Sequence, residues 1–370
     1  MKPMFFSALF ISVVVFQSCL VDIPPVPGTQ KNDPQIIVPP VLNSQINDST
    51  LSLITFTQND GAAVRSSNTE IMAIASSSLH LGFPDFVKNK GTWYVSMRFS
   101  EGHLPTKFGD IIIFKSNDLK KWEPEQIFMQ NGYDLRDPKF FIADSVLHVH
   151  FHSTTINPYG EVRNDYISSY DESTHKWTPA IKIEKHTKLK SWFWRITAND
   201  STLYSAAYMN GEPLRLFTST DGENFNESYK FDLKGLATET TLRFYDDKLY
   251  ALIRMEDGDA LFGETNKDDF SNWTFKNVAI HRFGGPNFLK YKDGFLLGGR
   301  DYITNKTKLY TYNYATNSLN EIYTFQSTLD TGYPGMIIEN DFLYLVYFSG
   351  ATGGKHIINL VIMDLVNIHI

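Results

Sequence analysis

The stretch Ser-Thr-Asp-Gly-Glu-Asn-Phe at residues 219–225 contains the pattern on which the fold prediction rests. Related stretches, in which Ser or Thr is followed by Asp and then by an aromatic residue, end at Trp122, Trp177 and Trp273. In such turns the Ser and Asp side chains accept hydrogen bonds from nearby backbone N–H groups, and the aromatic ring packs inward. The turn recurs about every fifty residues, with several short strand-like runs between copies, which predicts the repeated blades of a β-propeller. We expect these turns to be structural rather than catalytic.

The composition also favours strands. Of the 370 residues 42% are hydrophobic and 14% aromatic, and long amphipathic helical patterns are missing. We therefore expect an all-β fold in which residues 49–370 form a six-bladed β-propeller. The last repeat has only three strands of its own, so an N-terminal strand at Leu51–Thr57 is expected to complete that blade and close the ring. Residues 58–80 are expected to be irregular.

Residues 1–18 are expected to be a targeting segment. Lys2 provides a short positive start, and the apolar run Phe5–Phe16 is too short to span a bilayer as a stable helix. Cys19, the only cysteine, follows directly, so no internal disulfide can form. Residues 19–48 are rich in Pro, Asn and Gln and have no hydrophobic period, which predicts an extended tether.

The end of the targeting segment resembles a bacterial lipoprotein signal. Ser18 matches the small residue before the cysteine, whereas Phe16 stands where leucine is usual. The resemblance implies cleavage before Cys19 and lipidation of that residue. Acyl chains would hold a secreted protein at the bacterial outer membrane, facing the periplasm or the cell surface, without a spanning helix. The alternative is an ordinary secretory signal whose cysteine is incidental.

The starts of first strands and the ends of second strands converge on one funnel in a propeller, where ligands usually bind. The starts are expected to supply Asp85, Arg136, Asp137, Trp194, Arg195, Glu239, Asn287 and Tyr333. The ends are expected to supply Arg98, His152, Tyr208, Arg254, Arg300 and Tyr347, with Glu101 and His103 in the loop after the first of these. The concentration of arginine and acidic residues predicts a site for an anionic ligand.

This set of residues resembles the active site of the sialidases over about residues 80–365, and the turns resemble their Asp-boxes. Glu239, Arg254, Arg300 and Tyr333 follow the order of the sialidase glutamate, second and third arginines and tyrosine. The resemblance implies an exo-alpha-sialidase-like glycoside hydrolase with a retaining mechanism. Tyr333 would be the nucleophile and Glu239 the base that takes its proton. Arg254 and Arg300 would clamp the carboxylate of the sugar.

Two departures from the sialidase pattern bear on the substrate. The first sialidase arginine lies in a Phe/Tyr-Arg-Ile-Pro motif, and residues 81–84 here read Leu-Gly-Phe-Pro. Additional cationic or stacking contacts are expected from Arg98, Arg136, Arg195, His103 and Trp194. The general acid is left open among Glu101, Asp85 and Asp137. An ulosonic or uronic acid other than sialic acid fits these departures.

Other interpretations stay open. Asp85, the Arg-Asp-Pro triplet at 136–138 and Glu239 resemble the carboxylates of five-bladed furanosidases. A non-catalytic propeller that binds glycans at the cell surface is a third possibility. Arg136–Asp137 and Glu239–Arg254 could also be structural ion pairs, and Tyr333 a packed aromatic residue.

The expected partner is a glycan that ends in a carboxylate-bearing sugar. His148, His150 and His152 alternate along one strand, but neither a cysteine nor a clear carboxylate lies at ligand spacing, so neither a metal nor a cofactor is predicted. The net charge of −7, without a long basic run, argues against nucleic acid. We expect a monomer that meets the membrane only through its lipid.

Overall fold

The computed structural model describes residues 42–44, 48–57, 64–157, 160–186, 191–209, 211–350 and 354–370. Cys19, the expected targeting segment and nearly all of the expected tether lie outside these residues. The described part is all-β apart from one short helix, α1 (Asp48–Leu51). None of its helices has the length and apolar character needed to cross a membrane.

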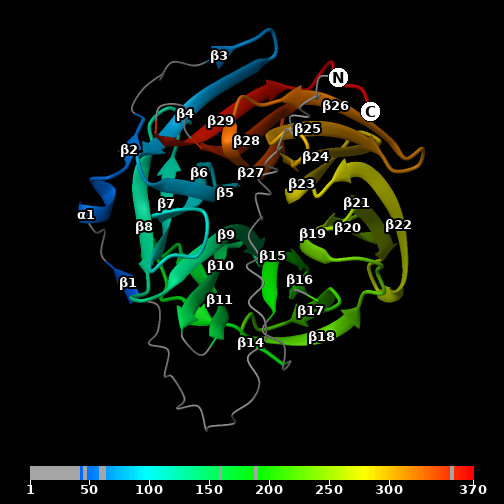
Figure 1. Cartoon of the computed structure of the whole chain (residues 1–370), viewed down its shortest axis with the longest axis horizontal. Coiled ribbons are helices and arrows are strands. Elements are labelled where there is room, and N and C mark those ends of the chain that lie inside the picture. The colour runs from blue at the N-terminus through cyan, green and yellow to red at the C-terminus, as the bar shows by residue number, and fades with distance from the viewer. Residues whose placement is uncertain are drawn as a thin grey trace, which may run out of the picture. The chain divides into compact units, whose positions relative to one another are not determined.

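The strands form five hydrogen-bonded sheets in a propeller-like arrangement (Figure 1). The first sheet contains β1 (Leu42–Ser44), β5 (His80–Asn89), β6 (Thr92–Ser100), β7 (Gly109–Ser116), β8 (Glu123–Met129), β9 (Asp134–Ala143), β10 (Val146–Asn157), β11 (Gly160–Asp171), β12 (Lys176–Trp177) and β13 (Ile181–Lys182). The second contains β14 (Glu184–Lys185), β15 (Trp192–Asn199), β16 (Thr202–Tyr208), β17 (Arg215–Ser219) and β18 (Asn224–Lys230).

The next two sheets are simple antiparallel meanders, and the last draws on both ends of the described chain. The third contains β19 (Ala237–Tyr245), β20 (Lys248–Met255), β21 (Asp259–Asn266) and β22 (Asp269–His281). The fourth contains β23 (Gly284–Tyr291), β24 (Gly294–Asp301), β25 (Lys306–Asn313) and β26 (Ser318–Thr324). The last contains β27 (Thr328–Glu339), β28 (Phe342–Gly350), β29 (His356–Asp364), β4 (Thr69–Ser77), β2 (Thr55–Phe56) and β3 (Val64–Arg65).

Five sheets replace the six separate blades expected from the sequence. The first two expected repeats share one ten-stranded sheet because β7 and β9 pair in parallel at Gly109 and Asp134. Glycine permits this approach, since a Cβ atom at Gly109 would collide with the Asp134 carboxyl group. Counting turn motifs could not reveal this junction, because it depends on one close contact between neighbouring repeats.

The predicted N-terminal strand is wrong in position. Residues 51–57 were expected to pair with the last strand, but β4 (Thr69–Ser77) pairs with β29 instead, and β2 lies on the outer side of β4. The interval 58–80, expected to be irregular, therefore contains β3 and β4. Nine consecutive strand residues, with Ile74 and Ala75 fully buried, make β4 the better partner for β29.

First strands lie near the centre of the arrangement, and fourth strands such as β8, β18 and β22 lie at its periphery (Figure 1). Successive first strands pack against each other from β5 to β27, and β27 packs against β5 in turn. At this last contact a Cβ atom on Gly335 would collide with the backbone of Phe86, so the two strands meet backbone to backbone.

The first strands share an irregularity that aims side chains toward the centre. The register shifts between Gly82 and Asp85 in β5, and equivalent shifts occur in β15, β19, β23 and β27. A residue with positive φ precedes proline in four first strands: Phe83 (φ 56), Asp137 (φ 50), Gly285 (φ 58) and Tyr333 (φ 56). Proline fits here because a bulge leaves one N–H outside the ladder.

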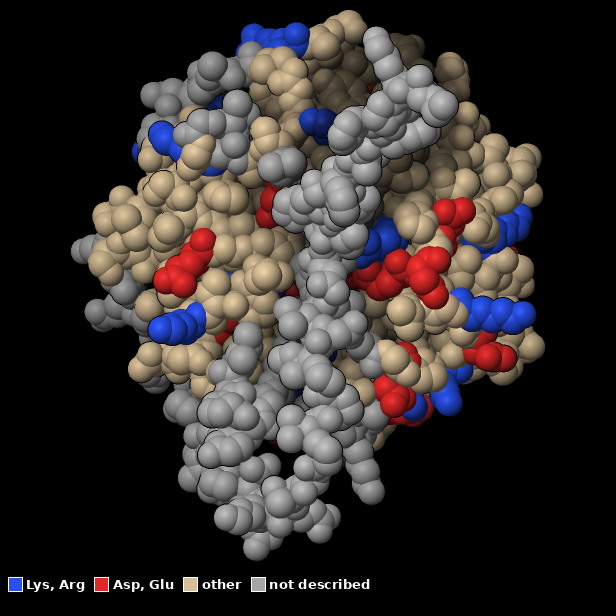
Figure 2. Space-filling model, in the orientation of Figure 1, with Lys and Arg blue, Asp and Glu red and all other residues tan. Residues whose placement is uncertain are grey.

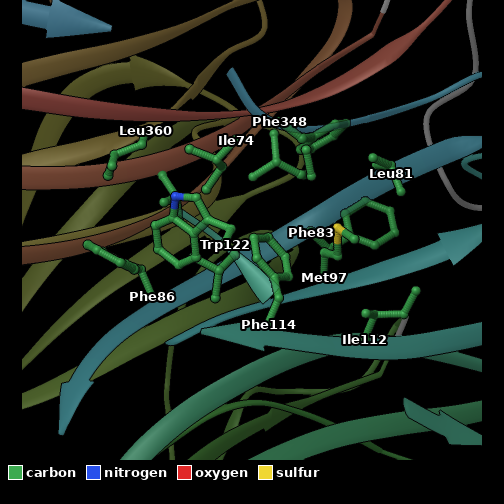
Figure 3. Close-up of a cluster of buried hydrophobic side chains, with 14 of the residues drawn as sticks. Ile74, Leu81, Phe83, Phe86, Met97, Ile112, Phe114, Trp122, Phe348 and Leu360 are labelled. Carbon is green, nitrogen blue, oxygen red and sulfur yellow. The ribbon is translucent and has the colours of Figure 1, made fainter. Parts of the chain in front are cut away.

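The recurrent turns are structural, as their chemistry suggests. Ser116 Oγ accepts a hydrogen bond from the N–H of Leu119 at 2.9 Å, and Asp118 Oδ1 accepts from the N–H groups of residues 120 and 121, each at 2.9 Å. The closing Trp122 is fully buried and packs edge-on against Phe114 at a ring distance of 5.4 Å (Figure 3). This turn thus fastens the first sheet to the apolar core.

Candidate active site

Tyr333 and Glu239 meet at the centre of the molecule. Tyr333 Oη donates a hydrogen bond to Glu239 Oε1 at 2.7 Å, and both residues are buried, with 5% and 6% exposed. Glu239 Oε2 accepts hydrogen bonds from Arg254 Nη1 at 2.9 Å and from the N–H of Gly285 at 2.6 Å. The bulges of β19 and β27 place the two side chains together, although 94 residues separate them in sequence.

Aromatic rings surround Tyr333. The ring of Phe83 lies 4.9 Å away and that of Trp194 lies 5.5 Å away. Trp194, predicted to contact substrate, is instead buried beneath this cluster. Lys139, which sequence analysis missed, lies 5.2 Å above the Trp194 ring and donates to the carbonyl of Phe83 at 3.2 Å. Burial lowers the pKa of Lys139 to about 8.

The structure separates the three candidate acids. Asp85 accepts hydrogen bonds from the N–H of Phe140 at 2.7 Å and from Arg195 Nη1 at 2.8 Å, so it joins neighbouring first strands. Glu101 is exposed in the loop after β6. Asp137 is buried on its bulge, and burial raises the pKa of its carboxyl group.

The surroundings of Asp137 are mixed in charge. The charge of Glu239 raises the Asp137 pKa further, while those of Arg136 and Lys139 oppose the rise. Arg136 Nε lies 4.0 Å from Asp137 Oδ2. A buried carboxyl group with a raised pKa beside a second carboxylate suits proton donation.

Three of the predicted arginines hold the framework together. Arg98 is fully buried, and its Nε and Nη2 bind the two oxygens of Asp134 at 2.8 and 2.7 Å. Arg136 lies 3.4 Å from the same carboxylate and donates to the carbonyl of His103 at 2.9 Å. Arg195 is the partner of Asp85. The positions of the arginines in the sequence predict that several of them lie near the centre. They do not predict which carboxylate each arginine binds.

Three other arginines gather around Tyr302. The guanidinium carbons of Arg254, Arg282 and Arg300 lie 4.9, 4.8 and 4.5 Å from the ring centre. Glu256 bridges two of them, at 2.7 Å from Arg254 Nε and 2.9 Å from Arg282 Nη2. Arg300 reaches Asp330 Oδ1 at 3.3 Å. Sequence analysis missed Arg282. This residue lies two positions before β23, so extending the expected start of that first strand by two residues would have included it.

Charge pairing extends to the surface. Figure 2 shows acidic and basic side chains interspersed over the described part of the visible face. Lys88 pairs with Glu339 at 2.6 Å, and Arg215 pairs with Glu227 at 2.7 Å. Around Tyr302, three arginines lie beside the tyrosine–glutamate pair, and the carboxylates of Glu256 and Asp330 contact them.

The histidines that alternate along β10 are engaged in hydrogen bonds. His148 Nδ1 lies 2.8 Å from Ser169 Oγ, and His150 and His152 both approach Asp165 Oδ1, at 3.0 and 3.2 Å. Lys185 binds the other oxygen of Asp165 at 2.6 Å. Asp165 is a carboxylate partner that the sequence interpretation did not identify.

A different group has the geometry of a metal site. Among the described residues, the ligand atoms of His80, His103 and Asp330 all lie within 4.8 Å of one another. Only His103 belonged to the predicted funnel. His80 and Asp330 were missed, because their distance in sequence hides the fact that β5 and β27 are neighbours.

Comparison with known proteins supports the fold. No family model matches the chain, and no curated protein does either. A solved structure of a Dyadobacter fermentans protein of unknown function has 15% identity and a TM-score of 0.66, covering 89% of this chain and all of that one. Trypanosoma rangeli sialidase with the inhibitor DANA has 10% identity and a TM-score of 0.60, over 82% of this chain and 59% of that one. The fold is sialidase-like.

A further solved structure that matches is NanB with Optactamide. It has 12% identity and a TM-score of 0.59, and the match covers 88% of this chain and 74% of that chain. The chain spans about three fifths of the trypanosome sialidase. Identity this low establishes the fold alone, so the chemistry must be argued from the residues of this chain.

Proposed function

We propose that this protein is a retaining glycoside hydrolase that releases a terminal acidic sugar, with Tyr333 as its nucleophile. The observation that carries the proposal is the 2.7 Å hydrogen bond from Tyr333 Oη to Glu239 Oε1 at the centre of a sialidase-like fold. A tyrosine is uncharged before it attacks, so it avoids the repulsion that a carboxylate nucleophile would exert on an anionic sugar.

The proposed reaction has two steps. Glu239 accepts the phenol proton as Tyr333 Oη attacks the anomeric carbon, and Asp137 donates a proton to the departing glycosidic oxygen. Water then cleaves the tyrosyl–sugar bond, with Asp137 as the base that takes its proton and Glu239 returning a proton to the phenol oxygen. Arg254 Nη1, at 2.9 Å from Glu239 Oε2, orients this carboxyl group toward Tyr333.

The arginine group around Tyr302 supports an acidic substrate. Arg254 also contacts Glu239, so a carboxylate bound by Arg254 and Arg300 would lie beside the nucleophile. Arg282 would add the third cation that Gly82 does not supply. Binding requires the substrate to compete with Asp330 for Arg300, which favours a dianionic or bidentate carboxylate ligand.

The deciding experiment compares wild type, Tyr333→Phe and Tyr312→Phe. Each is incubated with sialylated mucin glycans and with polysaccharides that bear uronate or ulosonate ends, and the released sugars are identified by mass spectrometry. We expect Tyr333→Phe to lose turnover by ~10³-fold or more, as when a nucleophile is removed. Tyr312→Phe is the matched control, since it also deletes a buried hydroxyl group but one bonded to Asn317. Unchanged turnover in Tyr333→Phe contradicts the proposal.

One observation favours a second mechanism. Burial raises the pKa of Asp137 and the charge of Glu239 adds to the rise, as expected for a general acid in a carboxylate pair of the furanosidase type. In that case Asp137→Asn and Glu239→Gln would abolish turnover, while Tyr333→Phe would change it by less than about tenfold. If wild type and all variants bind glycan but release no sugar, the protein is a non-catalytic glycan-binding protein of the cell surface.

We also propose that the protein is secreted and anchored by lipid on Cys19. The apolar segment before this cysteine and the Pro-rich residues after it support the proposal. In that arrangement the enzyme would work as a monomer on glycans near the membrane that holds it.

A further inference from the structure

Four side chains from separate parts of the chain meet beside the central site. His80 begins β5, His103 lies in the loop after β6, Asp330 lies in β27 and His356 begins β29. Asp330 Oδ2 is 3.0 Å from His80 Nε2 and 2.8 Å from His103 Nδ1. The ring of His356 lies 4.9 Å from that of His80. The cluster thus offers one carboxylate oxygen and two imidazole nitrogens at one point, with a third imidazole beside them.

A second observation comes from His356. Its Nδ1 atom is buried and has no hydrogen-bond partner within the described residues. A buried polar atom left unpaired is costly, and a nearby ion is one way to satisfy it.

Outer contacts also fit an ion site, with one exception. Arg300 binds Asp330 Oδ1 at 3.3 Å, which leaves Oδ2 facing the histidines, and carboxylates that bind metal ions are commonly oriented by such outer hydrogen bonds. Arg98 Nη1, however, lies 3.5 Å from His80 Nδ1. Ligation through Nε2 places the His80 proton on Nδ1, so this contact must lengthen when an ion binds. In the absence of an ion, two imidazoles share one carboxylate oxygen.

We propose that His80, His103 and Asp330 form a binding site for a divalent transition-metal ion of the zinc class, with His356 as an additional nitrogen donor. Two imidazoles and one carboxylate match the ligand preference of Zn²⁺, whereas Mg²⁺ prefers oxygen ligands. The ion would fasten the loop after β6 to the last sheet. The site does not depend on the proposed glycosidase chemistry, although Phe83 lies between the two, 5.0 Å from His103 and 4.9 Å from Tyr333.

The test is titration of the full chain, purified in detergent and freed of metal by a chelator. Isothermal calorimetry with Zn²⁺ and then Mg²⁺ is run on wild type, His103→Gln, Asp330→Asn and His281→Gln. His281 is the matched control. It also faces one carboxylate, since its Nδ1 lies 3.7 Å from Asp259 Oδ1, but this pair is not part of the three-ligand cluster. Visible spectra with Co²⁺ report the ligand geometry independently of glycan cleavage.

We expect wild type and His281→Gln to bind one tight equivalent of Zn²⁺ and no Mg²⁺ at the same concentration. His103→Gln and Asp330→Asn should bind Zn²⁺ at least about a hundredfold more weakly, since losing even a residue that only hydrogen-bonds to a metal ligand costs about 10–100-fold. His103 is partly exposed, so its substitution should leave the metal-free melting curve like that of wild type. Absence of stoichiometric Zn²⁺ binding in wild type, or equal binding by His103→Gln and Asp330→Asn, overturns the proposal.

Discussion

Asp137 illustrates how a backbone irregularity sets the chemistry of one residue. Its left-handed backbone (φ 50) and the following proline turn the carboxyl group into the protein centre, where burial raises its pKa. In the unfolded chain the same group has an ordinary pKa near ~3.9. The folded protein therefore binds this proton more tightly than the unfolded chain does.

This linkage predicts a pH-dependent gain in stability for Asp137→Asn. Below the unfolded pKa the carboxyl group is protonated in both states and costs nothing. As pH rises toward the raised folded pKa, ionisation increasingly favours the unfolded chain, so wild type loses stability that the neutral amide retains. Thermal melts from pH 4 to pH 9 should show a midpoint advantage for Asp137→Asn that is small at pH 4 and grows with pH. A constant difference would show that Asp137 does not titrate as argued.

Residue identities at the site were partly predictable from the sequence. Spacing brought Glu239 and Tyr333 to equivalent strand starts, and the structure joins them directly. Spacing could not show that Arg98 forms an ion pair with Asp134, since ion pairing depends on the side-chain rotamers of residues in separate strands. His80 and Asp330 escaped prediction for a related reason: their contact exists only because β27 packs against β5. A proline recurs near the start of four first strands, after residues that the structure shows with positive φ. That recurrence of proline is visible in the sequence and could have marked these bulges.

At the level of elements, β4 is the strand whose position the sequence misassigned. Leu51–Thr57 and Thr69–Ser77 both contain apolar residues, and alternation alone does not say which pairs with β29. The choice follows from length and burial in the finished sheet, which are tertiary properties. The repeating turns and most other strands were predictable because their signals are local.

The assignment of β4 is testable with Ile74→Ala. Ile74 is 1% exposed and packs into the core cluster with Val346 and Ile358. Removing its buried methyl groups should cost about 2–5 kcal/mol in the free energy of unfolding. Ile303→Ala is the matched control, because Ile303 is 75% exposed and should change stability by no more than about 0.5 kcal/mol. Denaturant unfolding of both variants measures the difference, and equal effects would place β4 outside the core.

At the scale of the whole molecule, residues 39–370 form one compact unit, and the expected anchor lies before it. Lipidation would therefore determine where the protein is located in the cell and would leave the structure of the sheets unchanged. This follows from the distance in sequence between Cys19 and β1 (Leu42–Ser44), the first described strand.

We accordingly predict that Cys19→Ser moves the protein from the membrane fraction to the soluble fraction without altering its melting temperature. The wild-type N-terminus should carry acyl chains detectable by mass spectrometry, and the variant should carry none. Wild type found unmodified, or a Cys19→Ser protein retained in membranes, would point to an ordinary secretory signal or to another means of attachment.

The composition of the last sheet has a consequence for how the chain reaches its native state. Glu70 in β4 pairs with Ile362 in β29, so this sheet is completed only when nearly the whole chain is available. Closing so long a loop is entropically slow compared with forming the hairpins of the middle sheets. During synthesis or export the edge of β4 that pairs with β29 must wait without its partner, which makes it prone to join other chains. Chains broken off shortly before β29 would keep that strand without ever acquiring its partner, and these fragments should be the ones that aggregate.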